Sequence, residues 1–211
     1  MAGTCMRQNE FGIGELSLLP LFLDLKGKKA LVIGTSQGAK WKAELLQATG
    51  ALVHALDRPP AVEIPLCEYS FVVADITDEA EAEKFAKQLQ AAGVAFNIVD
   101  RPELCQFQFG AIVNRSPVIV SISTSGAAPV LAQAIRQRIE SILPDSLGEW
   151  GALARRLRNH ITRAIHDSGL RRMVWQRFAG LAMSGGNPAE HDEHSLLASL
   201  LEVSVHKHKP A

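Results

Sequence analysis

Three short segments carry residue types that could do chemistry. Asp100 follows 96–99, Phe-Asn-Ile-Val, which is typical of a buried parallel strand. Its carboxylate is therefore expected at the carboxyl end of that strand, where open α/β sheets bind their ligands and where it could act as a general base. The turn 34–39, Gly-Thr-Ser-Gln-Gly-Ala, and the segment 123–126, Ser-Thr-Ser-Gly, each precede a predicted helix, whose N-terminus could bind an anion.

The turn 34–39 fits a dinucleotide-binding loop at its two ends but not in its middle. Gly34 and Ala39 occupy the outer positions of the pattern G-x-G-x-x-A, whereas Ser36 replaces the middle glycine that lets a pyrophosphate approach the backbone. Asp57, 23 residues after Gly34, stands where an acidic residue would bind the ribose hydroxyls. A strand–turn–helix without a nucleotide is the alternative interpretation.

The other candidate residues also have structural alternatives. Asp100 could be a turn or cap residue, and the hydroxyls of 123–126 could simply cap the helix that follows. Arg101 and Arg115 could supply positive charge to an acidic ligand, or they could be solvated surface residues.

The elements that must position these residues alternate between strands and helices. Strands are expected at 30–34, 52–56, 69–74, 95–99 and 117–123, and helices at 39–48, 79–90, 129–143 and through 147–183. This alternation predicts a parallel sheet with crossover helices. The expected fold class is therefore α/β, with a Rossmann-like parallel-sheet domain, a strand–helix segment and a small C-terminal helical domain.

The composition is that of an ordinary globular protein. Its 211 residues are 47% hydrophobic and 21% charged with no formal net charge, so the basic surface typical of nucleic-acid binding is not indicated. No apolar run reaches the roughly 18 residues of a membrane helix, and charged residues interrupt any signal-peptide core near the start. The three cysteines lack zinc or disulfide spacing. We expect a cytoplasmic protein with no nucleic-acid partner, no membrane partner and no metal site of its own.

The two ends of the chain are expected to lie outside the folded core. Residues 1–18 are interpreted as a loosely ordered extension, and residues 184–211 as a flexible tail. The tail contains four histidines, His191, His194, His206 and His208. Pairs of them could bind a metal adventitiously, but a solvated tail is the interpretation we favour.

Several segments together match one known family. They are 19–26, Leu-Pro-Leu-Phe-Leu-Asp-Leu-Lys, then 97–105, 139–144 and 171–178, and above all 112–126, Ile-Val-Asn-Arg-Ser-Pro-Val-Ile-Val-Ser-Ile-Ser-Thr-Ser-Gly, followed by 128–132. These segments resemble the precorrin-2 dehydrogenase/sirohydrochlorin ferrochelatase module of siroheme synthase. The resemblance spans residues 18 to 183 and is most specific over 97–144.

The resemblance implies a homodimer that oxidises precorrin-2 to sirohydrochlorin with NAD⁺. Many members of the family also insert Fe²⁺ (or Co²⁺) as a substrate to give siroheme. The implied domains are a Rossmann-like NAD-binding domain at 19–112, a dimerisation segment at 113–144 and a helical C-terminal domain at 145–183. The family's catalytic aspartate falls on Asp100.

The resemblance also implies which residues touch each ligand. The cofactor would contact Gly34, Thr35, Ser36, Gln37, Gly38, Ala39, Asp57, Asp75 and Ile76. The tetrapyrrole would contact Asn97, Arg101, Asn114, Arg115, Ser123, Thr124, Ser125 and Gly126. Because the substrate carries many carboxylates, arginines and helix-start donors suit it electrostatically. A single carboxylate near the ring centre could accept protons both in the oxidation and in metal insertion.

The departures from the family pattern all fall on the nucleotide side. Three consecutive glycines are usual where this chain has Gly34-Thr35-Ser36, and an Arg-Lys pair is usual where it has Trp41-Lys42. Ala74-Asp75-Ile76-Thr77-Asp78 replaces Ala-Thr-Asp, and the stretch between Asp57 and Phe71 is shorter by one strand and its connector.

Three functions stay open. The first is the NAD-dependent dehydrogenase, in which Ser36 would remove one phosphate hydrogen bond, worth about 1–3 kcal/mol, and so weaken affinity roughly ten- to a hundredfold. The second is a redox-inactive sirohydrochlorin chelatase or tetrapyrrole-binding paralogue with a degraded NAD site, and the third is a non-catalytic dimeric carrier. The chain has no room for the methyltransferase module of fused siroheme synthases, so a separate uroporphyrinogen methyltransferase is expected to supply precorrin-2.

Overall fold

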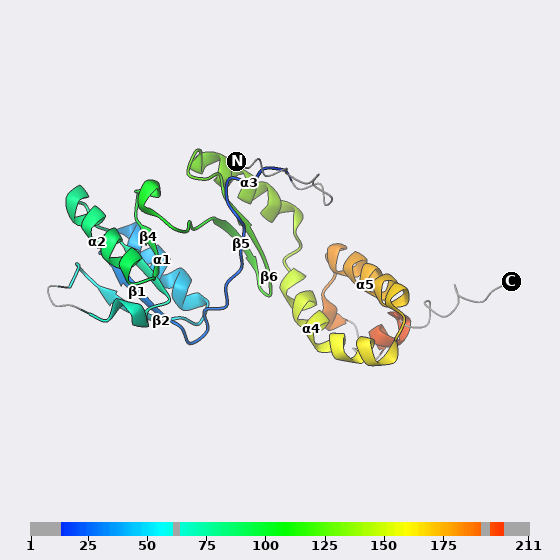
Figure 1. Ribbon diagram of the computed structural model, residues 1–211. Coiled ribbons are helices and arrows are strands. Elements are labelled where there is room, and N and C mark those ends of the chain that lie inside the picture. The colour runs from blue at the N-terminus through cyan, green and yellow to red at the C-terminus, as the bar shows by residue number, and fades with distance from the viewer. Residues whose placement is uncertain (1–13, 61–63, 191–194, 201–211) are drawn as a thin grey trace, which may run out of the picture. The chain divides into compact units, whose positions relative to one another are not determined.

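The computed structural model describes residues 14–60, 64–190 and 195–200 (Figure 1). The chain divides into two compact units, the first ending at Phe109 and the second beginning at Gly110. The boundary expected from the sequence lay at 112/113. Each unit has a hydrophobic core of its own, and no helix in the described part of the chain is long and apolar enough to cross a membrane.

Unit one is built on a four-stranded parallel sheet. Its strands are β1 (Lys29–Ile33), β2 (Leu52–Leu56), β3 (Phe71–Ala74) and β4 (Ala95–Ile98), in the order β2-β1-β3-β4. The chain runs from β1 to the neighbour on one side, β2, and then to the neighbour on the other side, β3. The sheet therefore has its topological switch point between β1 and β3, the place where open α/β sheets bind ligands.

Two helices cover the opposite faces of this sheet, α1 (Gln37–Ala48) and α2 (Glu79–Ala91) (Figure 1). Along β1 the side chains alternate, so Ala30 and Val32 join the core beneath α1 while Leu31 and Ile33 join the core beneath α2. Because both faces are covered, the strands are almost continuously apolar. This arrangement confirms the α/β parallel-sheet prediction.

Unit two begins with an antiparallel hairpin of β5 (Ala111–Arg115) and β6 (Val118–Ile122). Helix α3 (Pro129–Ile142) packs on the hairpin, followed by α4 (Leu147–Ala164) and α5 (Ser168–Met183). The strand at β6, the helix opened by Pro129 and the helical region after residue 147 were all expected. Strand β5 was not, and it turns the expected strand–helix segment into a hairpin plus a helix.

The expectation of a flexible tail from residue 184 onward is wrong for residues 195–200. These residues are helical, and Leu196 and Leu200 are only 5% and 2% exposed. They pack with Trp150, Phe178 and Ala182 in the core of the helical region. The spacing i, i+4 places the two leucines on one helical face. All four histidines of the tail lie outside the described residues.

Candidate functional site

The carboxyl ends of all four strands in unit one lie at one edge of the sheet. Ile33 is paired with both Leu56 and Ala74, and Ala74 is paired with Ile98, so the strands end in register. The residues that follow them are Gly34, Asp57, Asp75 and, after Val99, Asp100. The carboxylates predicted as site residues from three different strands are therefore gathered at this edge.

Gly34 and Asp75 meet at the switch point. The backbone N–H of Asp75 donates to the carbonyl of Ile33 at 2.8 Å, which extends the β1–β3 pairing. Gly34 has a φ of +114°, and a Cβ placed on it would lie 2.6 Å from the Cβ of Asp75. The glycine is thus required by the close approach of the chain at Asp75, whatever the turn binds.

Ser36 is the N-cap of α1. Its Oγ accepts a hydrogen bond from the backbone N–H of Ala39 at 3.1 Å, and its φ of −63° is ordinary for a side-chain-bearing residue. The hydroxyl therefore occupies a donor that a phosphate at this helix N-terminus would otherwise use. A Cβ on Gly38 would make only ordinary contacts, the nearest at 3.5 Å with Val99.

Asp100 lies in an exposed turn with a left-handed backbone, at a φ of 59°. The next residue, Arg101, points its guanidinium back across the edge, where Nη2 donates to the carbonyl of Thr77 at 3.0 Å and Nη1 lies 3.9 Å from Glu79. Arg101 therefore links the turn after β4 to the turn after β3. Of the other predicted contacts, Ile76 is buried in the core on the α2 side.

Asn97 was predicted to contact the tetrapyrrole, but its side chain is buried, at 6% exposure, and satisfied inside the unit. Its Oδ1 accepts from Lys42 Nζ at 2.9 Å, and its Nδ2 donates to the carbonyl of Phe107 at 2.9 Å and to Cys105 Sγ at 3.2 Å. The Cys105 thiol in turn lies 3.2 Å from the carbonyl of Ile98 and 3.1 Å from that of Arg101. This chain of contacts holds both sides of the turn that presents Asp100.

Burial shifts both ionisable members of this network. Desolvation lowers the pKa of Lys42, and attraction to Cys105 in its thiolate form, to Asp100 and to Asp75 opposes that change. Desolvation raises the pKa of Cys105, against the effects of the Ile98 hydrogen bond and the Lys42 charge. Cys105 therefore stays a neutral thiol near pH 7. Sequence reasoning missed this role of Lys42 and Cys105, because the contacts join segments far apart in the chain.

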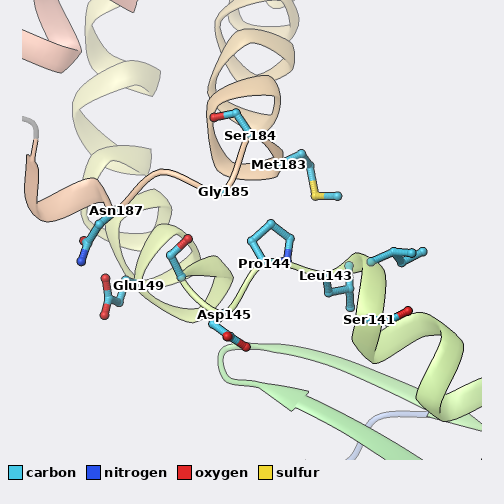
Figure 2. Close-up of a pocket in the computed structure, with 11 residues that line it drawn as sticks. Ser141, Leu143, Pro144, Asp145, Glu149, Met183, Ser184, Gly185 and Asn187 are labelled. Carbon is cyan, nitrogen blue, oxygen red and sulfur yellow. The ribbon is translucent and has the colours of Figure 1, made fainter.

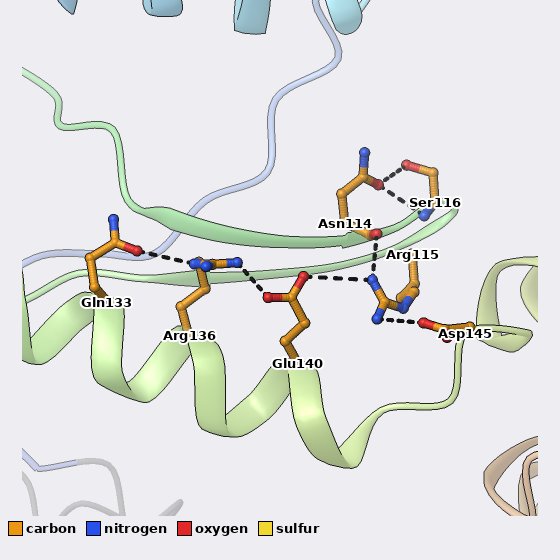
Figure 3. Close-up of polar contacts among 7 residues, drawn as sticks. All are labelled: Asn114, Arg115, Ser116, Gln133, Arg136, Glu140 and Asp145. Atoms are coloured by element: carbon orange, nitrogen blue, oxygen red, sulfur yellow. Dashed lines mark hydrogen bonds and ion pairs between the residues drawn. The ribbon is translucent and has the colours of Figure 1, made fainter.

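In unit two, Asn114 and Arg115 are engaged with their own unit (Figure 3). Asn114 Oδ1 accepts from both the backbone N–H and the hydroxyl of Ser116. Arg115 Nη2 donates to Asp145 at 2.8 Å, and its Nη1 lies 3.9 Å from Glu140. The Arg115 Nε is buried and has no hydrogen-bond partner among the described residues. Arg115 thus ties the hairpin to the end of α3 and to the α3–α4 connection.

The segment 123–126 closes a turn before α3. Ser123 Oγ accepts from the backbone N–H of Ser125, and Ser125 and Gly126 both have positive φ. The N-cap of α3, Ala128, makes no side-chain cap bond, although Thr124 Oγ1 accepts from its N–H at 3.4 Å. Because β5 and β6 pair antiparallel, 123–126 lies at the opposite end of the hairpin from Arg115. The structure thus separates the two groups of tetrapyrrole contacts predicted in this unit.

A groove of about 670 Å³ lies elsewhere in unit two, where the end of α3, the start of α4 and the end of α5 meet (Figure 2). Its charged side chains, Asp145 and Glu149, are both acidic, so it does not suit a polycarboxylate. The remaining lining residues are Ser141, Ile142, Leu143, Pro144, Ser146, Met183, Ser184, Gly185 and Asn187. None of these eleven residues was predicted as a site residue.

Two families match parts of the chain. Residues 57–111 match the family described as putative NAD(P)-binding, and residues 117–142 match the family described as sirohaem biosynthesis protein, central. The first match includes Asp57, Asp75 and Asp100 at the carboxyl edge of the sheet, and Asn97 within β4. It begins after the turn 34–39.

Curated relatives match much more of the chain. Siroheme synthase 1 of Yersinia enterocolitica is 36% identical over 87% of this chain and 44% of its own length. Siroheme synthase of Pseudomonas paraeruginosa is 34% identical over 83% of this chain and 43% of its own length, and that of Methylococcus capsulatus is 31% identical over 93% and 46%. The chain thus spans less than half the length of these relatives.

A solved structure described as "SirC, precorrin-2 dehydrogenase" has the same fold, with a TM-score of 0.62 at 18% identity over 87% of this chain and 98% of that one. Together with the sequence matches, this confirms the resemblance to the siroheme synthase family. The chain therefore belongs to the siroheme synthase family and carries its NAD(P)-binding and sirohaem-biosynthesis central segments.

Proposed function

We propose that this chain oxidises precorrin-2 to sirohydrochlorin with NAD⁺, as a step of siroheme biosynthesis. The observation that carries the proposal is the position of Asp100, an exposed carboxylate at the carboxyl edge of the sheet, in a segment that matches an NAD(P)-binding family. The backbone of its turn is left-handed, and the part-buried Cys105 thiol contacts the carbonyls of Ile98 and Arg101 on the two sides of Asp100. Such a fixed carboxylate suits a general base.

The cofactor site fits in part. Gly34 stands at the switch point, packed against Asp75, and Asp57 is exposed at the end of β2, where ribose hydroxyls would bind. At the helix N-terminus, the Ser36 hydroxyl must give up the N–H of Ala39 before a phosphate can accept it. When bound, NAD⁺ supplies the hydride acceptor.

The protein's own part in the reaction is proton removal and charge recognition. As the substrate loses a hydride, a ring proton must also leave, and we assign its acceptance to the Asp100 carboxylate. For the substrate carboxylates we assign the N–H groups and hydroxyls of 123–126, because Asn114 and Arg115 are already bonded inside unit two. Arg101 and Asn97 are proposed to act mainly by shaping the turn around Asp100, since both are already bonded inside unit one.

A redox-inactive sirohydrochlorin chelatase or tetrapyrrole-binding paralogue is the second candidate. The observation that favours it is the bond from Ala39 N–H to Ser36, which closes the helix N-terminus without a nucleotide. In this case Asp100 would accept pyrrole N–H protons while Fe²⁺, as a substrate, enters the ring.

We further propose that the chain acts as a cytoplasmic homodimer. Exposed apolar side chains on α3 support the dimer, since Val130 is 82% exposed and Leu131 and Ile142 more than half exposed. Apolar patches of this kind are typical of protein–protein contacts. Sedimentation of the wild type beside Leu131→Asp tests this, and a monomeric wild type would contradict it.

The direct test supplies precorrin-2 and NAD⁺ anaerobically and follows sirohydrochlorin by its absorbance. A no-enzyme control is essential because precorrin-2 oxidises spontaneously. We expect NAD⁺-dependent turnover well above this control. Turnover no faster than the control would reject the dehydrogenase. Sirohydrochlorin and Fe²⁺ would then be supplied directly, since siroheme formation identifies the chelatase and its absence a binding protein.

A further inference from the structure

Helix α4 carries positive charge with little negative charge to balance it. Its acidic residue, Glu149, lies in the first turn, and the next acidic residue along the chain is Asp167, after the helix has ended. Exposed arginines stand between them, among them Arg155, Arg158 and Arg163, which we call the outer arginines. Because the chain as a whole has no formal net charge, its composition does not reveal this local excess.

The packing of α4 leaves the outer arginines in solvent. Leu153, Leu157 and Ile161 turn into the helical core. On another side, a Cβ placed on Gly151 would lie 2.9 Å from Pro117 Cγ in the turn between β5 and β6. The core and the hairpin thus cover part of the circumference of α4, and the arginines occupy what remains.

Arginines elsewhere in the chain reach carboxylates, whereas the outer arginines do not. Arg101 lies beside Glu79, and both Arg115 and Arg136 lie beside Glu140. Among the residues that the structure places, no carboxylate forms an ion pair with any of the outer arginines, and their guanidinium groups make no hydrogen bond. Their charge is therefore not used within the folded chain.

This arrangement disfavours the helix and does not serve its end. Arg155 and Arg158 are three residues apart, so they lie side by side as like charges, which destabilises a helix. Cations are favoured at a helix C-terminus, but Arg171 of α5 already fills that position, since its Nη1 donates to the carbonyls of Ile165 and His166 at 2.8 and 2.7 Å. Charges of both signs would keep the surface soluble without the repulsion. The excess therefore points to an anionic ligand.

We infer that the outer arginines form a capture surface for the tetrapyrrole, which binds substrate carboxylates on encounter, before the ring enters the reaction site. The inference deepens the proposed function and rests on it, because that function supplies an anion with many carboxylates. Concentrated positive charge raises the local concentration of such an anion and speeds its association. Arginine suits this role, since its planar fork binds a carboxylate through two hydrogen bonds. The outer arginines contact no reacting atom.

The direct test uses uroporphyrin, a stable tetrapyrrole rich in carboxylates, so it needs neither NAD⁺ nor turnover. The fluorescence of uroporphyrin reports its binding to the full chain in a titration at low salt. The Gln variant combines Arg155→Gln, Arg158→Gln and Arg163→Gln. The Lys variant has lysine at the same three positions and so keeps the charge.

A matched control removes the same number of positive charges from unit one. It combines Lys28→Gln, Lys84→Gln and Lys87→Gln, all at exposed positions. Circular dichroism confirms the folding of every variant. The three single Arg→Gln variants keep the test decisive if the combined variant does not fold.

At low salt we expect the Gln variant to bind uroporphyrin about tenfold more weakly than the wild type, because each exposed charge pair contributes only modestly. The Lys variant and the control should bind as the wild type does. Salt of about 1 M, at which the Debye length is about 3 Å, should remove the difference. Equal affinities of the wild type and the Gln variant at low salt would overturn the inference. A Lys variant as weak as the Gln variant would also overturn it, since charge would not be the cause.

Two further probes identify the anion. Coproporphyrin, which carries fewer carboxylates than uroporphyrin, should bind the wild type more weakly, and equal binding would contradict recognition through carboxylates. A DNA duplex presents phosphates instead. If the duplex bound more tightly than uroporphyrin and lost its affinity in the Gln variant, the surface would be a nucleic-acid interface and the inference would be wrong.

Turnover provides the last readout. With precorrin-2 and NAD⁺ at low salt, the loss in the Gln variant should appear as a higher KM for precorrin-2 rather than a lower kcat. A loss in kcat alone would overturn the inference, because the arginines would then act in the reaction and not in capture. If the wild type fails to oxidise precorrin-2, the proposed dehydrogenase fails, while the uroporphyrin titration still decides whether this surface binds a tetrapyrrole.

Discussion

The turns after β1 and after β4 lie at the same edge of the same sheet but are held in different ways. In the turn after β1 the side-chain hydrogen bond is local, from the N–H of Ala39 to Ser36 Oγ three residues before it, and the backbone N–H of Gly34 donates to the carbonyl of Leu56. The turn after β4 is held by a buried polar network that reaches back to Lys42, 55 residues from its partner Asn97. A local cap can be exchanged cheaply, whereas a buried network leaves unpaired groups when one member is removed. We therefore expect chemistry to depend on the turn after β4 and cofactor affinity to be adjustable at the turn after β1.

The largest expected effect is at Asp100. Asparagine tolerates the left-handed backbone found there, so Asp100→Asn should fold normally while losing the base. We expect precorrin-2 oxidation to fall about 10²–10⁴-fold, with an unchanged urea midpoint. The absorbance assay measures the rate of oxidation, and a urea titration measures the midpoint of unfolding. Glu103→Gln is the control, because Glu103 is an exposed carboxylate close to Asp100 in the sequence. Full activity in Asp100→Asn would show that the reaction does not depend on the carboxylate in the turn after β4. The expected contrast between the two turns would then be wrong.

Gly34→Ala tests the structural side of the turn after β1. The new Cβ would lie 2.6 Å from the Cβ of Asp75, on a backbone with a φ of +114° that L side chains rarely adopt. Overpacking and backbone strain together should lower the free energy of unfolding by about 2–4 kcal/mol. Gly38→Ala is the control, since its Cβ meets nothing closer than 3.5 Å. Equal stability of the two variants would show that Gly34 is not a packing requirement.

Ser36→Gly tests whether the local cap limits cofactor binding. Glycine replaces a serine N-cap at a cost of only a few tenths of a kcal/mol, and it frees the N–H of Ala39 for a phosphate. We expect NAD⁺ to bind about tenfold more tightly, equivalent to about 1.4 kcal/mol, as measured by calorimetry. Ser36→Ala removes the cap but keeps a Cβ, so it should gain less. Weaker binding in Ser36→Gly would mean that the serine contacts the cofactor.

The sequence predicted those parts of the site that follow from strand order. Asp57, Asp75 and Asp100 each follow an apolar run, and parallel strands bring their carboxyl ends to one edge, so their grouping was foreseeable. The Lys42–Asn97 pair was not, because which side chains meet between a helix and a strand depends on their packing. The family comparison drew attention to Lys42 only as part of an altered Arg-Lys pair.

In unit two, too, the sequence did not predict which segments and side chains meet. Strand β5 pairs with the strand directly after it, but its residues Ala-Ile-Val-Asn-Arg were interpreted only through the family match. Arg115 was expected to be available to an acidic ligand, whereas Asp145 and Glu140 already bind it. A sequence shows that an arginine is present, but not whether a carboxylate from a later connection reaches it first.

The smallest expected effect is the pH dependence of stability from Cys105. Burial raises the pKa of the Cys105 thiol above its ordinary value of 9.0 in the folded state, so its contribution to stability is complete below pH 9.0 and is lost as the pH rises through the folded-state value. The stability difference between wild type and Cys105→Ala should therefore be constant below pH 9.0 and shrink above it. Lys42 has the opposite sign, because its lowered pKa adds stability as the pH rises toward 10.5. Cys105→Ala removes a charge that opposes this lowering, so it enlarges that gain and makes the difference shrink further. Urea unfolding from pH 7 to pH 10 measures the difference, with Cys67→Ala, an exposed cysteine, as the control. A difference that stays constant up to pH 10 would mean that the thiol is solvated in solution and that the network below Asp100 is open to water.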